Sequence, residues 1–191
     1  RLARVAGSRL RLRAMVGQEV VLCMVVMAPV VAMMMALRQP VVRLLYSGEF
    51  VAVLGMVSWC LVGTVFRALS WCMSFVILAK GDGRTFLVTE TLSAAIGLAL
   101  NVVCYTHWGL DGLGMSFAAW YVAYTAIVGA VYFGRYRLRL ARACAAATVW
   151  ALAVALSALW AVNGGHHMAA AAVAVAAVAV SMAVVRRAWR R

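Results

Sequence analysis

The stretch FVAVLGMVSWCLVGTVFRALSWCMSFVILA, residues 50–79, decides how this chain can fold. Arg67 is its only charged residue, and the run exceeds the roughly 20 apolar residues that cross a bilayer as one helix. Two crossings would need about 40 residues, so we expect a single long span. Of the 191 residues, 67% are hydrophobic and only 12% are charged, against about 25% in soluble domains. The sequence therefore predicts an all-α, polytopic transmembrane helical bundle.

Apolar length marks six spans, and the lipid bilayer is the first expected partner. The predicted spans are residues 18–37, 50–79, 85–105, 113–133, 145–162 and 168–185. A net charge of +13 could indicate nucleic-acid binding, but the basic residues cluster between the apolar blocks. That arrangement is typical of membrane topology, so we expect no nucleic-acid partner.

Three arginine clusters predict the orientation of the spans. They precede the first span, follow the fourth and follow the sixth, and positive clusters favour the cytoplasmic side. Both ends of the chain are therefore expected in the cytoplasm, with Arg38 and Arg43 as exceptions in the first outer loop. Because the chain has seventeen arginines against one lysine, with abundant alanine and valine, as in GC-rich bacterial genomes, we expect a bacterial inner (plasma) membrane. The chain begins at Arg1 without a signal-peptide pattern, and we expect it to be part of a longer protein.

The sequence shows no catalytic or metal-binding pattern. The five cysteines include no CxxC pair, and the few acidic residues are scattered over both predicted sides. KGDGR, residues 80–84, predicts a tight turn and has too few phosphate-binding features for a P-loop. His166 and His167 lie in a predicted outer turn, where an exposed position is favoured over a metal role. We expect no enzyme activity, no metal and no cofactor.

Arg67 is the leading candidate for a functional residue. An arginine at the centre of a span costs about 2.5 to 3.5 kcal/mol on insertion scales, and such residues usually face a bundle interior or a watery cavity. Helical spacing gives it a small and polar face: Cys60, Gly63, Thr64, Ser70, Trp71 and Ser74. The opposite face is expected to contact lipid: Leu61, Val65, Ala68, Cys72, Phe75 and Val76. A structural ion pair and ligand binding both stay open for Arg67.

Further polar residues lie at helical spacing in the third predicted span. Glu90 is a candidate partner for Arg67, a proton or cation site, or an interfacial carboxylate. Asn101 is expected to form a hydrogen bond between helices, the commoner use of a buried amide. In the fourth span, Gly114 and Ala118 form a small-xxx-small pair that predicts a close helix contact. The candidate cavity-lining residues are Arg67, Ser70, Ser74, Glu90 and Asn101.

Three motifs, in this order, resemble the polysaccharide-biosynthesis (O-antigen translocase) branch of the MOP flippase superfamily. The first is QPVVRLLYSGEFVAV, residues 39–53, which contains Pro40, Gly48, Glu49 and Phe50. The second is the turn ILAKGDGRTF, residues 77–86. The third is WGLDGLGMSFAAWYVAY, residues 108–124, which contains Gly109, Gly112 and Gly114.

The resemblance implies a fold and a function. Residues 1–142 would form the last four spans of a twelve-span core with two lobes, and residues 143–191 an additional C-terminal transmembrane hairpin. The missing N-terminal spans of the same protein would complete the transporter. Such proteins move lipid-linked oligosaccharides to the outer leaflet by alternating access. Our hypothesis is that Arg67, Ser70 and Ser74 contact the lipid diphosphate or its glycan. The alternatives are a multidrug exporter of this superfamily and a non-transporting membrane subunit that holds an enzyme partner.

Overall fold

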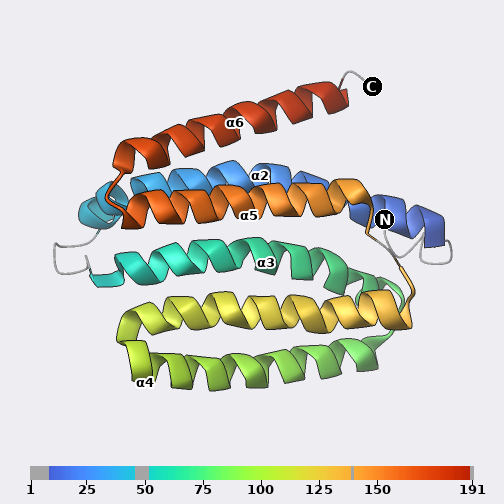
Figure 1. Ribbon diagram of the computed structural model, residues 1–191. Helices are drawn as coiled ribbons and strands as arrows, with labels where there is room; N and C mark the ends of the chain where they lie inside the picture. Colours follow the sequence, from blue (N-terminus) through green and yellow to red (C-terminus); the bar gives the residue numbers. More distant parts are fainter. Residues whose placement is uncertain (1–8, 46–51, 139, 190–191) are drawn as a thin grey trace.

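The computed structural model describes residues 9–45, 52–138 and 140–189. Over these residues the chain is helical and contains no strand, which confirms the all-α prediction (Figure 1). The elements are α2 (Arg9–Leu45), α3 (Leu54–Ala79), α4 (Gly83–Ala130), the short π-helix η2 (Val131–Arg135), α5 (Arg142–Asn163) and α6 (His167–Trp189).

The surface of the bundle indicates a helical membrane protein. Five helices, counting α4 as one, are long and apolar enough to cross a membrane. Large apolar side chains remain open on their outer faces: Leu87 is 66% exposed, Leu98 68% and Met168 85%. Contiguous apolar exposure of this kind is rare on soluble proteins and is expected where lipid covers the surface. The residues form a multi-pass bundle, as the composition predicts.

The helix α4 reverses its direction at Gly109. A straight helix of 48 residues would be about 72 Å long, more than twice the hydrocarbon thickness of a bilayer. At Gly109 the backbone adopts φ 59° and ψ −135°, and the helix folds back into two antiparallel legs, which contain the predicted span 85–105 and most of the predicted span 113–133 (Figure 1). Trp120 Nε1 donates to Ser93 Oγ at 2.8 Å across the legs, and Ser116 donates to Asn101. The expected role of Asn101 between helices is confirmed.

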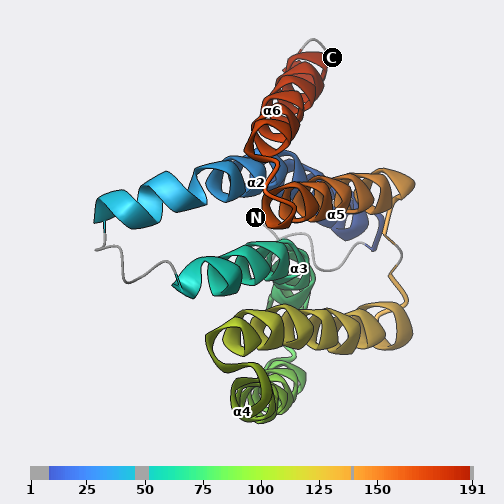
Figure 2. The same ribbon diagram turned by 60° about the vertical axis from the view of Figure 1, so that its left-hand side comes forward.

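The helix α3 lies at the centre, between the second leg of α4 and the helices α2 and α5 (Figures 1 and 2). Its contact with α4 is made through residues without bulky side chains. A Cβ added to Gly63 would lie 2.6 Å from the Phe117 ring and 2.9 Å from Ala118 Cα. A Cβ on Gly114 would meet the backbone of Met56. The close contact predicted from the Gly114 and Ala118 pair is therefore confirmed.

The prediction that one side of α3 faces lipid is wrong in part. Val65 and Val76 are fully buried, whereas Phe75 is 56% exposed. The reason is that α2 packs along this side of α3, with Cys72 Sγ 3.7 Å from Cys23 Sγ of α2. A helix covered on two opposite faces carries apolar residues on both, and these look the same in the sequence as residues that face lipid.

The helix α2 continues through two prolines and packs against α3, α5 and α6. Pro29 has no N–H, so the carbonyl of Val25 loses the partner that a regular helix would supply. Ser181 of α6 donates to this carbonyl at 2.7 Å, and its side chain is buried. The C-terminal hairpin is thus attached to α2 by a hydrogen bond that the proline makes available.

We predict that Ser181→Ala lowers the thermal stability of the detergent-solubilised protein, because it leaves a buried carbonyl unsatisfied, at a cost of about 1 to 3 kcal/mol. In a Pro29→Ala background, the new N–H of residue 29 can bond to Val25, so the same serine substitution should cost much less. A double-mutant cycle of unfolding midpoints measures this coupling. Equal costs in the two backgrounds would contradict the assignment.

We also predict that Gly114→Ala destabilises the bundle, because its methyl group has no space against α3. Overpacking of this kind costs about 1 to 3 kcal/mol. Gly83→Ala is the matched control, since nothing lies within 4 Å of the position of its Cβ. Unfolding followed by circular dichroism should show a lower midpoint for Gly114→Ala alone. Similar midpoints for the two variants would show that α3 and α4 are less closely packed.

Candidate functional site

The Arg67 side chain lies against aromatic rings of two helices. Its guanidinium carbon is 4.6 Å from the centre of the Trp71 ring on α3 and 5.6 Å from that of Tyr121 on α4. Among the described residues it forms no ion pair. Cation–π contacts hold a guanidinium by its face, with an attraction that grows when water is excluded. Tyr121 is itself fixed by stacking on Trp120, with ring centroids 5.0 Å apart.

A pocket of about 220 Å³ lies beside this arginine, between α3 and the two legs of α4. It is lined by Trp71, Ser74, Phe75, Phe86, Glu90 and Tyr124. The Tyr124 hydroxyl donates to the Glu90 carboxylate and shares a 3.1 Å hydrogen bond with Ser74 Oγ. The pocket therefore combines an apolar wall with one carboxylate whose position is set by a neighbouring tyrosine.

Three of the five candidate cavity residues gather at this pocket. Ser74 and Glu90 line it, and Arg67 stacks on Trp71, which forms part of its wall. Ser70 does not: its side chain is fully buried, and its hydroxyl donates to the Arg67 carbonyl at 2.9 Å. Asn101 lies 11 residues beyond Glu90, or about 16 Å along the helix, and pairs with Ser116 instead.

The ion pair considered for Arg67 and Glu90 is not formed. Glu90 is engaged by Tyr124, and the only ion pair among the described residues joins Arg135 to Asp82 at 3.0 Å. The described contacts of Arg67 are instead with the faces of two aromatic rings. A cation–π site was not among our expectations, although Trp71 lies one turn from Arg67 in the sequence.

The KGDGR turn folds as predicted. Gly81 has φ 71°, a left-handed conformation that favours glycine, and Asp82 caps α4 by accepting a hydrogen bond from Thr85 N at 3.2 Å. The Tyr136 hydroxyl also donates to Asp82, at 2.9 Å. The pKa of the Asp82 carboxyl is held below its usual value, first by the Thr85 hydrogen bond and then by Tyr136 and Arg135. The turn is thereby joined to the far end of α4.

The residues of the other two motifs have different outcomes. Pro40, expected after the first span, lies inside α2, which ends only at Leu45. Gly48, Glu49 and Phe50 lie outside the described residues. Gly109 forms the reversal of α4 by its left-handed backbone. Gly112 and Gly114 pack against backbone, the former against Cys104 of the first leg and the latter against α3.

Arg38 is a partly buried polar residue that sequence reasoning missed, because it was placed in an outer loop. It lies in α2 and donates to the Leu54 carbonyl at 3.1 Å, to Ser58 Oγ and to the Val162 carbonyl at 3.5 Å. These groups belong to the start of α3 and the end of α5. The only signal in the sequence was a lone arginine next to an apolar run. An arginine at the membrane interface gives the same signal as one that lies within the bundle.

Metal binding finds no support in the part of the chain that the structure describes. No group of three or more His, Cys, Asp or Glu side chains is close enough to hold an ion. His166 and His167 lie at the turn between α5 and α6, as predicted, and both are exposed.

Comparison with known proteins found no family model, no curated protein and no solved structure that matches this chain.

Proposed function

We propose that this chain is part of a lipid-linked oligosaccharide flippase of the bacterial inner membrane. In this proposal it supplies six crossings, with both ends cytoplasmic, as the C-terminal part of a two-lobed transporter of the MOP type. The two legs of α4 provide the third and fourth of these crossings. The motif resemblance and the environment of Arg67 support the proposal.

The observation that carries the proposal is an arginine within an apolar span that has no acidic partner among the described residues. Its guanidinium rests on Trp71 and Tyr121 by its face, which leaves the N–H groups at its edge available. A guanidinium edge binds phosphate bidentately, and low dielectric strengthens the contact. A lipid diphosphate is a substrate that needs this group, and the exposed Trp71 ring beside it suits the apolar face of a sugar.

The free edge of Arg67, and not the charge of the neighbouring pocket, favours an anion over the cationic drugs of a multidrug exporter. Glu90 is the only acidic residue that lines it, and Tyr124 already donates to its carboxylate. An exporter of cations would instead need a carboxylate free to pair with its substrate. The membrane-subunit alternative predicts that Arg67 only supports the packing, and the experiment below separates it from transport.

We predict that Arg67→Ala in the complete protein lowers glycan export at least about tenfold, the cost of losing one charge-assisted hydrogen bond of about 1.5 to 3 kcal/mol. Arg67→Lys should retain part of the activity, because it keeps the charge and loses the bidentate geometry. Arg43→Ala, at an exposed position in the last turn of α2, is the matched control. The measurement is surface glycan in a strain that lacks its own flippase, at equal protein levels.

Two results would contradict this proposal. Unchanged export by Arg67→Ala at equal expression would remove Arg67 from the transport path. Equal loss of protein from the membrane for Arg67→Ala and Arg67→Lys, with normal export per molecule, would show a structural role and favour the membrane-subunit alternative.

A further inference from the structure

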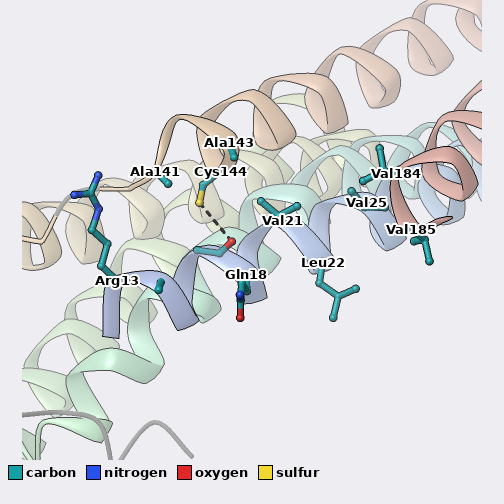
Figure 3. Close-up of a pocket in the computed structure, with 12 residues that line it drawn as sticks. Arg13, Gln18, Val21, Leu22, Val25, Ala141, Ala143, Cys144, Val184 and Val185 are labelled. Carbon is teal, nitrogen blue, oxygen red and sulfur yellow. Dashed lines mark hydrogen bonds between the residues drawn. The ribbon is translucent and has the colours of Figure 1, made fainter. Parts of the chain in front are cut away.

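A groove of about 650 Å³ lies between α2, α5 and α6, and none of the predicted site residues lines it. Nine of its twelve lining residues are Ala, Val, Leu or Gly, and the other three are Arg13, Gln18 and Cys144 (Figure 3). The thiol of Cys144 also faces it, but this group already donates to the Gly17 carbonyl at 3.4 Å. Away from Arg13 and Gln18, the groove therefore offers an apolar surface with little hydrogen-bonding capacity of its own.

The groove opens toward the outside of the bundle, where a bilayer would lie. Its rim residues remain open: Leu22 is 56% exposed, Val184 38% and Val185 39%. Water is a poor occupant, because it needs two or more polar partners in such a space. A hydrocarbon chain packs against apolar walls and needs no hydrogen-bond partner there. The chemistry of the groove thus selects an acyl chain.

The length of the groove matches one leaflet. On α2 it extends from Arg13 to Val25, which is 12 residues or about 18 Å. Half the hydrocarbon thickness of a bilayer is about 15 Å. A second apolar groove, of about 510 Å³, adjoins it at Val25 and Val185 and includes Arg186 in its lining. Two adjoining grooves, each with an arginine, suit a lipid with two acyl chains.

Positive charge collects at the Arg13 end of the groove. The helices α2 and α5 both begin at this end, as Figure 1 shows, and Arg142 lies between Ala141 and Ala143, which line the groove together with Arg13. Arg13 and Arg142 are both exposed, and neither forms an ion pair with a described residue. Figure 3 shows Arg13 at the end of the groove, beside Ala141. Basic clefts between membrane helices bind anionic lipid headgroups.

We propose that this groove binds an anionic phospholipid of the surrounding bilayer, with an acyl chain along the groove and its phosphate at Arg13. The lipid would join α6 to α2 and α5 at the end where α6 diverges from them in Figure 2. This site is separate from the Arg67 pocket, and the proposal does not depend on the flippase assignment.

The test uses the purified full-length protein in detergent and two lipids with identical oleoyl chains. Phosphatidylglycerol should raise the unfolding midpoint clearly more than phosphatidylcholine does, because only the first carries a net negative charge. Arg13→Ala should weaken the binding of phosphatidylglycerol about fivefold, the value of one arginine near an anionic headgroup. Arg43→Ala, at the other end of α2, should have no effect.

A second variant separates the groove from general surface charge. Ala143→Trp places a large ring among the groove residues while keeping every arginine, so it should abolish stabilisation by both lipids. If this variant does not fold, the comparison of Arg13→Ala with Arg43→Ala still decides the matter. Inorganic phosphate and a polyprenyl phosphate serve as further probes.

Several results would overturn the proposal. Equal stabilisation by the two phospholipids would exclude headgroup recognition, and an effect of inorganic phosphate as large as that of the lipid would exclude a role for the chain. If the two lipids stabilised Ala143→Trp as much as they stabilise the unchanged protein, the stabilisation would come from surface charge and not from the groove. Stronger binding of polyprenyl phosphate than of phosphatidylglycerol would assign the groove to a transported substrate.

Discussion

The close contact between α3 and the second leg of α4 is the constraint on which the candidate site depends. Gly63 and Ala118 allow the two backbones to approach, and the two segments run in the same direction. One turn further along each, Arg67 meets Tyr121, and beyond them Ser74 meets Tyr124. Larger side chains at the contact would separate the helices, and the arginine would lose the aromatic ring supplied by α4.

A second constraint is that the interior of an apolar bundle contains no water to satisfy freed backbone groups. Pro29 frees the Val25 carbonyl, and Ser181 binds it. Arg38 reaches the carbonyls of Leu54 and Val162, near the beginning and the end of neighbouring helices. These polar residues hold the C-terminal hairpin and α3 to α2. The hairpin is therefore bonded into the bundle through α2, which packs against α3, α5 and α6 alike.

The sequence predicted the features that depend on local pattern. Long apolar runs gave the helices, KGDGR gave the turn, and a small-xxx-small pair gave the close contact of α4. It could not tell lipid from protein as the neighbour of an apolar face, so Val65 and Val76 were assigned to the wrong environment. It also placed Arg38 in a loop, because the length of α2 beyond Pro40 depends on contacts with distant residues. The pairing of Glu90 with Tyr124, 34 residues away, depends likewise on the reversal at Gly109.

Arg38 and Arg67 are both partly buried, and their surroundings give them different capacities. Arg38 donates to two carbonyls and a hydroxyl, so most of its hydrogen bonds are used within the protein. Arg67 is held by ring faces, which attract the charge but accept no hydrogen bond at the edge of the guanidinium. A purely structural arginine in low dielectric gains most from filled donor positions, because unsatisfied donors there are costly. The aromatic setting of Arg67 therefore fits a residue whose hydrogen-bond partner arrives with a ligand.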